Sequence, residues 1–434
     1  MTPEVKKRIE QIRQGIVPEG YVKDKDGIYP RDWASKKIGQ WLKLAERPIV
    51  LQDEEEYQLV TVRRGFGGVD SRGSFLGKNV LVKNYFIVKT GDFIISKRQI
   101  AHGACGIVPP ELDGAVVSNE YNVFLPQDGT NIQMFNLMMQ LPHYKRLFYL
   151  MSDGVHIEKL LFKTQDWMKR TLAMPLLKEQ KKIAEILSTQ DKAIELLGRK
   201  IEELKRFKKG CLEKMFPRKG QKVPEKRFPG FTDDWEQRKL GGIGKARSGV
   251  GFPDAEQGGV TGIPFFKVSD MNLDGNESEM TVANNYVTAE QIAVHRWSPI
   301  TELPAIFFAK VGAAVMLNRK RLCRFPFLLD NNTMAYSLSS TKWDADFAKA
   351  LFGTVDLTSL VQVGALPSYN AGDVESMEIY LPSLLEQEQI GGFFKQLDNL
   401  ITLHQRKLEE MKNQKKALMQ LLLTGIVKTK GEVR

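Results

Sequence analysis

The residues of this 434-residue chain that could do chemistry match no catalytic motif. Methyl transfer to an amino nitrogen needs an Asn/Asp-Pro-Pro-Tyr/Phe loop, but Pro109-Pro110 stands in Val-Pro-Pro-Glu. A phosphate-binding loop needs G-x-x-x-x-G-K-[ST]. Residues 73–78 are one residue short of it, and Gly244-Lys245 lacks the following Ser or Thr. The 5 His fall at no metal-binding spacing, so we expect neither catalysis nor a metal site in this chain.

The charge of the chain favours a different chemistry, which is contact with a polyanion. Its formal net charge is +11 and its pI is about 9.3, although such values are not specific to nucleic-acid binding. Arg can bridge guanine, and Lys neutralises phosphate. Asn318 could read adenine or be a turn residue. The predicted DNA contacts, each with solvated surface charge as its alternative, are Arg63, Arg64, Arg72, Lys97, Arg98, His102, Lys310, Arg319, Lys320, Arg321 and Arg324.

A repeated segment must position these residues. Pro175–Phe216 recurs from Pro382 without a gap, at an offset of 207 residues (382 − 175). Each copy is typical of a long helix that proline opens, with Glu-Gln in a first turn whose exposed amides suit such acceptors.

Apolar residues in both copies step by four and three, which is the spacing of a coiled-coil seam. Polar residues interrupt it at Gln190, His404 and the equivalent pair Lys208 and Lys415. The predicted seam and subunit-docking residues are Ile183, Leu187, Ile194, Leu197, Ile201, Leu204, Ile390, Phe394, Leu397, Ile401, Leu408 and Met411.

A second similarity defines whole modules. Residues 31–41 match residues 233–243, aligning Trp33 with Trp235 at an offset of 202 (235 − 33). Strand-like segments follow each tryptophan, at Tyr57–Val62, Val80–Val88, Asp92–Ser96, Ile107–Val108, Val116–Phe124, Phe265–Val268, Pro304–Phe308, Ala313–Leu317 and Met334–Leu338. His143–Met151 and Asp344–Phe352 are helical in character. The fold class is therefore α+β, with two mixed globules that are each followed by a long helix.

The boundaries follow from these patterns. Residues 217–232 are rich in proline and basic residues and are predicted to be a linker. Thr2-Pro3 could cap a short helix through Arg13. The predicted parts are a lead-in (1–30), a first domain (31–172), a first helix (173–216), the linker, a second domain (233–379), a second helix (380–424) and a tail (425–434).

The length of the predicted helix suggests that it fixes the distance between the two globules. From Ile183 to Met215 a helix would span about 48 Å. The second globule begins where the first helix ends, so antiparallel pairing with a pseudo-two-fold axis is the simplest arrangement. Because DNA repeats every ~34 Å, such a rod could set two basic readers for a two-part site.

At this point the chain resembles the specificity subunits of type I restriction–modification systems. The resemblance covers about residues 32–424 and depends on the D-W-x-x-x-K/R-[LI]-G opening, the [LM]-P-x-x-x-E-Q-x-x-I start of the helix, and their duplication. It implies that each globule is a target recognition domain for half of a bipartite, asymmetric site. The helices would set the spacer and dock two methyltransferase subunits, which recruit restriction subunits.

The resemblance also places S-adenosylmethionine, ATP and Mg on those partner subunits, so this chain would be non-catalytic. The 3 Cys form no disulfide framework, we recognise no signal peptide, and no apolar stretch could cross a bilayer, so we expect a cytoplasmic protein. Two alternatives stay open: a DNA methyltransferase or nuclease with its own specificity domains, and a coiled-coil nucleic-acid-binding scaffold.

Overall fold

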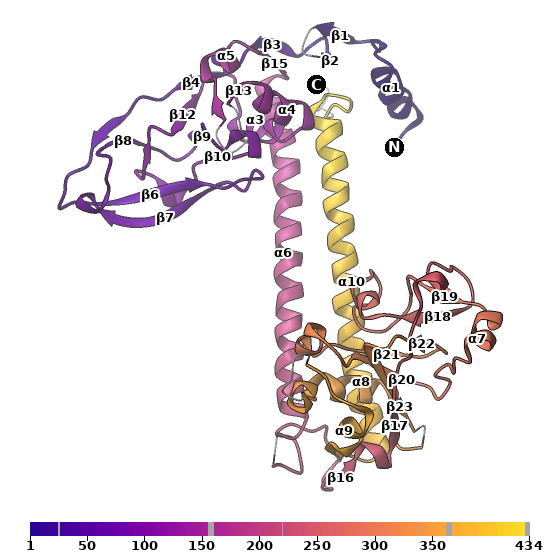
Figure 1. Cartoon of the computed structure of the whole chain (residues 1–434). Helices are drawn as coiled ribbons and strands as arrows, with labels where there is room; N and C mark the ends of the chain where they lie inside the picture. The colour runs from indigo at the N-terminus through magenta and orange to yellow at the C-terminus, as the bar shows by residue number, and fades with distance from the viewer. Residues whose placement is uncertain (25–26, 155–159, 219, 340, 362–366, 430–434) are drawn as a thin grey trace. The chain divides into compact units, whose positions relative to one another are not determined.

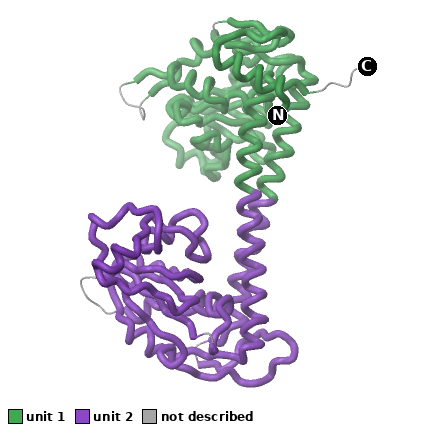
Figure 2. The backbone as a smooth tube through the Cα atoms, turned by 90° about the vertical axis from the view of Figure 1, so that its right-hand side faces the viewer, with its two compact units in different colours: residues 1–196, 408–434 green, residues 197–407 purple. Residues whose placement is uncertain are grey.

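The computed structural model describes residues 1–24, 27–154, 160–218, 220–339, 341–361 and 367–429. The chain forms two compact units, one of Met1–Leu196 with Leu408–Arg434 and the other of Leu197–Lys407 (Figure 2). Each unit holds one recognition module and part of both long helices. Residues 155–159 of the first predicted domain and 430–434 of the predicted tail lie outside the described residues.

The first unit begins with helix α1 (Pro3–Arg13), and its Thr2 cap confirms the expected short helix. A hairpin of β1 (Tyr21–Asp24) and β2 (Gly27–Pro30) follows. This lead-in contacts the segment after α10, because Tyr21 Oη donates to Gly425 O at 2.6 Å and Arg8 Nη1 donates to Ile426 O. The lead-in is therefore part of the folded unit.

Two sheets form the body of the first module. The four-stranded sheet has the order β10-β9-β12-β4, and the five-stranded sheet has the order β5-β8-β11-β6-β7. The strands are β4 (Leu42–Leu44), β5 (Pro48–Val50), β6 (Glu56–Val62), β7 (Val69–Leu76), β8 (Asn84–Ile87), β9 (Phe93–Ser96), β10 (Cys105–Ile107), β11 (Val116–Ser118) and β12 (Tyr121–Pro126). Short elements flank them: α2 (Ile38–Trp41), α3 (Ile132–Met139), α4 (Pro142–Leu150), β13 (Ser152–Asp153), β14 (Leu161–Phe162), α5 (Thr164–Met168), and the 3-10 turns Gly77–Asn79, Ile100–His102 and Pro110–Leu112.

The second unit repeats this plan with fewer strands. Its sheets have the orders β17-β23-β20-β21 and β19-β18-β22. The strands are β17 (Gly244–Ser248), β18 (Ile263–Phe266), β19 (Tyr286–Val287), β20 (Ala305–Ala309), β21 (Lys320–Cys323), β22 (Leu328–Leu329) and β23 (Thr333–Leu338). The helices are α7 (Ala289–His295), α8 (Ala345–Thr354) and α9 (Ala371–Ser376), with 3-10 turns at Leu240–Gly242, Asp254–Glu256, Val268–Asn272, Ala313–Leu317 and Leu357–Leu360.

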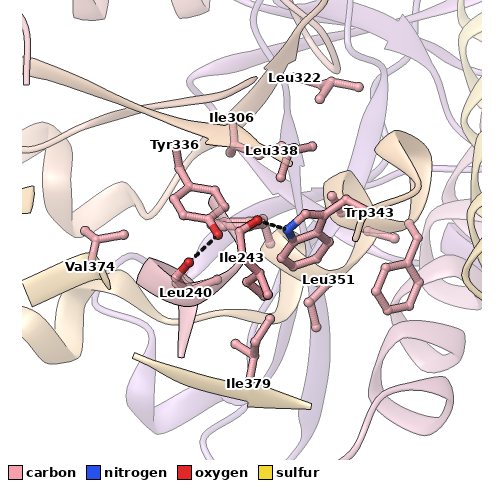
Figure 3. Packing of buried hydrophobic residues seen from close by; sticks show 14 of the residues in the cluster. Leu240, Ile243, Ile306, Leu322, Tyr336, Leu338, Trp343, Leu351, Val374 and Ile379 are labelled. Carbon is pink, nitrogen blue, oxygen red and sulfur yellow. Dashed lines mark hydrogen bonds between the residues drawn. The ribbon is translucent and has the colours of Figure 1, made fainter. Parts of the chain in front are cut away.

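Aliphatic and aromatic residues together fill the core of the second unit (Figure 3). Tyr336 and Trp343 are buried among aliphatic side chains, and each places its polar atom on a backbone carbonyl. Tyr336 Oη donates to Leu240 O at 2.7 Å, and Trp343 Nε1 donates to Ile243 O at 2.9 Å. Because buried polar groups need partners, these two bonds fix the 240–243 turn against β23 and against Trp343, which lies just before α8.

Both modules close on themselves in the same way. Strand β3 (Ala34–Lys37), directly after Trp33, pairs antiparallel with β15 (Thr171–Met174), which leads into the first long helix. Strand β16 (Glu236–Lys239), directly after Trp235, pairs in the same sense with β24 (Glu378–Leu381). In each module, the opening found by sequence similarity thus pairs with the strand that directly precedes the repeated helical segment.

The long helices are α6 (Leu177–Met215, 39 residues) and α10 (Leu384–Leu423, 40 residues) (Figure 1). In the first unit Lys415 Nζ lies 2.5 Å from Asp191 Oδ1, and in the second unit Lys208 Nζ lies 2.5 Å from Asp398 Oδ1. Each pair joins the early part of one helix to the late part of the other, which confirms the predicted antiparallel pairing. The pairs are equivalent under the 207-residue repeat, and two of the seam interruptions are therefore lysines that meet a carboxylate.

The predicted seam residues all lie away from full solvent exposure. Those that are half-buried are Ile194, Leu197, Leu204, Leu408 and Met411. The remaining seven are buried: Ile183, Leu187, Ile201, Ile390, Phe394, Leu397 and Ile401.

Some strand predictions were wrong. Ala313–Leu317 is a 3-10 turn, because Gly312 and Asn318 have positive φ at its two ends and only Val315 is buried. The predicted strand Val116–Phe124 is two strands, β11 and β12, which belong to different sheets. Apolar content alone did not reveal these breaks, since a short apolar run fits a turn as well as a strand.

Candidate nucleic-acid interface

The Gln of each Glu-Gln motif anchors its long helix to the recognition domain. Gln180 is fully buried. Its Oε1 accepts from the backbone N–H of Asn131 at 2.7 Å, and its Nε2 donates to Gly129 O and Pro175 O, both at 2.8 Å. We expected this side chain to accept hydrogen bonds from the exposed amides of its own helix. That expectation was wrong, because Gln180 Oε1 accepts from the backbone N–H of Asn131, the N-cap residue of α3.

Gln387 makes the equivalent contacts in the second unit. Its Oε1 accepts from the backbone N–H of Asp344 at 3.0 Å, and its Nε2 donates to Lys342 O and Pro382 O at 3.1 Å. Gly391, one turn later, lets α10 pass the start of α8, since a Cβ there would lie 2.5 Å from the backbone N of Phe347. Each recognition domain is thus joined to its helix by the same buried carboxamide.

The Glu of the motif holds the segment that follows the opposite helix. Buried Glu386 accepts two hydrogen bonds from Arg227 of the linker, at 2.9 and 2.7 Å. Beside this pair the linker residue Phe228 packs against the core of the second unit. In the first unit, Glu179 Oε1 accepts from the backbone N–H of Thr429 at 3.3 Å. The described part of the linker is therefore irregular in backbone but fixed in place.

In the first unit, the structure brings Arg63, Arg64 and His102 together. The two arginines start the loop that joins β6 to β7, in which Phe66 has positive φ. Gly65 N donates to His102 O at 2.7 Å, and Phe66 N donates to Gly103 O at 2.8 Å. The hairpin tip therefore lies on the turn that carries His102. Both arginines are exposed, and Arg63 forms an ion pair with Asp70.

The other candidates of the first unit flank this tip. Arg72 is exposed on β7, and Lys97 and Arg98 follow the end of β9. Arg98 Nε lies 2.6 Å from Glu120 Oε2, with both side chains about half exposed. The structure thus offers one exposed basic tip with further cations on adjoining elements.

In the second unit, the predicted cluster from Arg319 to Arg324 is engaged by the protein itself. Arg319 Nη1 donates to Asn272 Oδ1 and Arg321 Nε donates to Asn276 O, both at 2.6 Å. Arg324 forms ion pairs with Glu279 at 3.0 Å and Asp346 at 2.5 Å. These residues stay predicted DNA contacts, but each already has a partner within its own unit.

Lys320 is the most enclosed member of this cluster. Its ammonium donates to Asn318 Oδ1 at 2.7 Å and to Val355 O. Burial lowers the pKa of Lys320 to about 8, because an apolar environment disfavours the charged amine. Asn318 itself has positive φ and caps the turn before β21, which is the turn role left open by the sequence. Lys310, the remaining candidate, is half-buried after β20.

Three further properties of the described residues concern metal ligands, cysteine chemistry and hydropathy. Among them, no group of three or more His, Cys, Asp or Glu side chains could hold a metal ion. Burial raises the pKa of the Cys323 thiol to about 12, which makes it a poor nucleophile. Within the same part of the chain, no helix has the length and apolar character needed to span a membrane.

Comparison with known proteins explains the repeated design. The family described as the type I restriction modification DNA specificity domain matches the chain twice, at residues 30–206 and 232–413. The two matches cover most of the chain and coincide with its two modules. The chain therefore belongs to this family of type I restriction–modification specificity subunits.

Individual relatives agree over nearly the full length. The chain is 23% identical over 440 residues to the type I restriction enzyme MjaVIII specificity subunit of Methanocaldococcus jannaschii, covering 93% of this chain and 94% of the relative. Its fold is similar to a chain solved in work on assembly and conformational transition of the type I R-M system (TM-score 0.57, 15% identity, 92% of this chain and 99% of that chain). It is also similar to the type I restriction–modification S subunit of M. genitalium (TM-score 0.54, 14% identity, 90% and 96%).

Proposed function

We propose that this chain reads a bipartite, asymmetric DNA sequence, with one recognition domain on each half-site. The observation that carries this proposal is that both modules share the same strand pairing and the same side-chain hydrogen bonds. Strand pairs β3–β15 and β16–β24 close the modules, and Gln180 and Gln387 anchor them to α6 and α10 by equivalent bonds. Two similar readers in one chain suit a site with two parts. Different loops in the two modules suit different half-sequences.

The helices would set the length of DNA between the half-sites. With 39 residues, α6 spans roughly 58 Å, more than one helical repeat of DNA. The equivalent ion pairs Lys208–Asp398 and Lys415–Asp191 support a fixed register between the helices. A fixed register would give the complex a fixed spacer.

The same helices would dock two methyltransferase subunits, through which restriction subunits join the complex. Leu196 on α6 and Leu403 on α10 support this role, because they are repeat-equivalent, apolar and more than half exposed. This chain would be non-catalytic. S-adenosylmethionine, ATP and Mg would be bound by the partner subunits, which would carry out methylation, translocation and cleavage.

Within the first recognition domain, the tip with Arg63, Arg64 and His102 is the proposed first contact with DNA. Its exposed guanidinium groups extend from a glycine-rich hairpin loop that is fastened to a neighbouring turn. Such a loop can enter a groove, since arginine reads guanine or neutralises phosphate there.

Exchange of one domain tests this function. Residues 33–170 would be replaced by those of a similar chain, and methylated sites would be mapped with the methyltransferase subunits present. The expected result is a change in one half of the recognised sequence, whereas a change in both halves would refute separate readers. Methyl transfer by the purified chain would favour the enzyme alternative. DNA binding without sequence preference at moderate salt would favour the scaffold.

A further inference from the structure

In the second unit, Asp398 of α10 joins the helix pair to the recognition domain. One carboxylate oxygen, Oδ1, lies 2.5 Å from Lys208 Nζ of α6. The other oxygen, Oδ2, lies 3.2 Å from Lys349 Nζ of α8 and accepts from Ser278 Oγ at 3.4 Å. A single side chain therefore contacts the second helix of the pair and two elements of the reader.

Further ion pairs extend this contact into the domain. Lys349 also lies 3.4 Å from Glu279, and Glu279 lies 3.0 Å from Arg324 at the end of β21. Arg324 lies 2.5 Å from Asp346, which in turn pairs with Lys395 of α10 at 2.8 Å. We call this set, together with Asp398 and Lys208, the ionic network.

The central members of the ionic network are shielded from water. The side chains of Asp346, Asp398 and Lys349 are only 13%, 15% and 17% exposed. Ion pairs in such surroundings are screened less than those on an open surface, and a network holds its members better than an isolated pair does. It can therefore hold one element at a defined position on another.

The loop that carries Ser278 and Glu279 is itself rigid. Asn276 is fully buried, and its Oδ1 accepts from the backbone N–H groups of Thr281 and Val282. Its Nδ2 donates to Asp270 O at 2.8 Å, and Met280 N donates to Leu322 O of β21 at 2.8 Å. These hydrogen bonds fix the position of Glu279 relative to the sheet. An ion pair that holds Glu279 therefore also holds the domain to which the sheet belongs.

The repeat offers an internal comparison. Asp191 is the equivalent of Asp398 under the 207-residue offset, and it pairs with Lys415 as Asp398 pairs with Lys208. However, the Asp191 side chain is 50% exposed, and among the contacts described for the first unit its carboxylate has no further ion pair. The helix-to-helix contact therefore occurs twice, while the extension into a reader is present at Asp398.

We propose that Asp398, Glu279 and Arg324 are positioning residues, which fix the second recognition domain on the spacer helices and thereby define the permitted spacer. This rests on the proposed function, in which that domain reads one half-site. Without the ionic network the domain would keep its base contacts but could tilt on the helices. Sites with a spacer one base pair too long or too short would then be accepted.

The test uses the full chain assembled with its methyltransferase subunits. After the wild-type site has been mapped, methylation rates are measured on DNA with both half-sites and spacers of different length. Asp398→Asn should lower the preference for the correct spacer over one longer by one base pair by roughly fivefold, the upper range for one partly exposed ion pair. Asp191→Asn is the matched control, because it removes only the equivalent helix-to-helix contact, and it should lower the preference clearly less than Asp398→Asn does.

Glu279→Gln tests the part of the ionic network that lies inside the reader, because it removes the ion pairs of Glu279 with Lys349 and Arg324 and leaves the Lys208–Asp398 and Lys349–Asp398 pairs in place. It should relax the spacer preference as Asp398→Asn does, with both half-sequences still required. A preserved preference in Glu279→Gln, an equal loss of methylation at every spacer, or an equal effect of Asp191→Asn would overturn the inference. A wild-type complex without any preferred spacer would refute the proposed function instead.

Discussion

The carboxamide of Gln387 accepts the backbone N–H of Asp344, at 3.0 Å, at the point where α8 begins. Asp344 in turn caps α8, since its Oδ1 accepts from Phe347 N at 2.7 Å. Gln180 stands in the same relation to Asn131, which caps α3 by accepting from Met134 N at 2.8 Å. In both units one side chain thus joins the first turn of a long helix to the first turn of a domain helix.

Gln387→Ala should destabilise the second unit. The substitution leaves the Asp344 N–H and the Lys342 and Pro382 carbonyls without this partner, at roughly 1–3 kcal/mol for each buried group left unpaired. Chemical unfolding followed by circular dichroism measures the loss. Gln389→Ala, at an exposed position two residues further along α10, is the control. Equal stabilities of the two variants would refute the anchoring role.

Arg227→Ala should lower the free energy of unfolding, because it leaves the Glu386 carboxylate buried without its ion-pair partner. Glu386 is 1% exposed, and its carboxylate accepts hydrogen bonds from Nε and Nη2 of Arg227. Breaking a buried pair by removing one partner costs roughly 3–5 kcal/mol. The double variant Arg227→Met with Glu386→Gln should recover part of this loss, since no uncompensated charge remains. If the single variant unfolds as the wild type does, the linker is not held by this pair.

The stability of the second unit should depend on Lys320 in alkaline solution. Burial lowers the pKa of Lys320 from its ordinary value of 10.5 to about 8, so the unfolded chain binds this proton more tightly than the folded chain. The resulting penalty is complete below pH 8 and is lost as the pH rises to about 10.5. The free energy of unfolding of the wild type relative to Lys320→Met should therefore rise across this window.

The measurement for Lys320 is urea unfolding at a series of pH values. Lys342→Met, at an exposed position in the same unit, is the control for the loss of one lysine. A difference between wild type and Lys320→Met that stays flat from pH 8 to 10.5 would show that the folded protein does not disfavour the charged amine.

Replacing Arg63 and Arg64 with Ala should flatten the salt dependence of DNA binding. The slope of log affinity against log salt should fall by roughly one for each phosphate that the variant no longer neutralises. Lys6 and Lys7, exposed on α1, provide a control variant with the same change in charge. If both variants had the same slope, Arg63 and Arg64 would be solvated surface charges and not phosphate contacts.

The triple variant of Arg319, Lys320 and Arg321 should change the slope less than the hairpin variant and stability more. Asn272, Asn276 and Val355 already accept hydrogen bonds from these cations. Binding at several salt concentrations, together with thermal unfolding, separates the two effects. A slope change as large as that of the hairpin variant would show that DNA displaces these internal partners.

Lengthening both helices together should lengthen the spacer. Seven residues inserted after Arg199 and after Arg406 keep the coiled-coil phase nearly unchanged and preserve both lysine–aspartate pairs. The added rise is about 10 Å, close to three base pairs. Mapping of methylated sites should recover both half-sequences with a longer spacer. Recovery of the original spacer would mean that the helices do not set the distance.

The helices and their pairing could be predicted because the necessary information is local and repeated. The spacing of apolar residues gives the seam, and the 207-residue offset gives the symmetry. Side-chain partners could not be predicted in this way. Gln180 and Gln387 were identified from their motif, but the backbone N–H groups that donate to them lie on segments whose position depends on the fold.

Basic residues show the same limit. Arg64 and Lys320 are both cations between apolar segments. However, Arg64 is exposed at a hairpin tip, whereas Lys320 is half-buried and donates a hydrogen bond to the Val355 carbonyl. Strand β7 was missed because its sequence is polar and its outer face is open to solvent. The contact of Tyr21 with Gly425 joins residues 404 positions apart, for which no sequence pattern exists.

The strand pairs β3–β15 and β16–β24 have an evolutionary consequence. Each places the beginning and the end of a module side by side, so genetic exchange between these two points replaces everything that lies between them. The incoming segment can differ in length, as the offsets of 202 and 207 already show for the two modules of this chain. Recombination at these strands would exchange one whole recognition domain in one event and keep the strand pair that closes the module; under the proposed function, the exchange would change the sequence preference of that half-site.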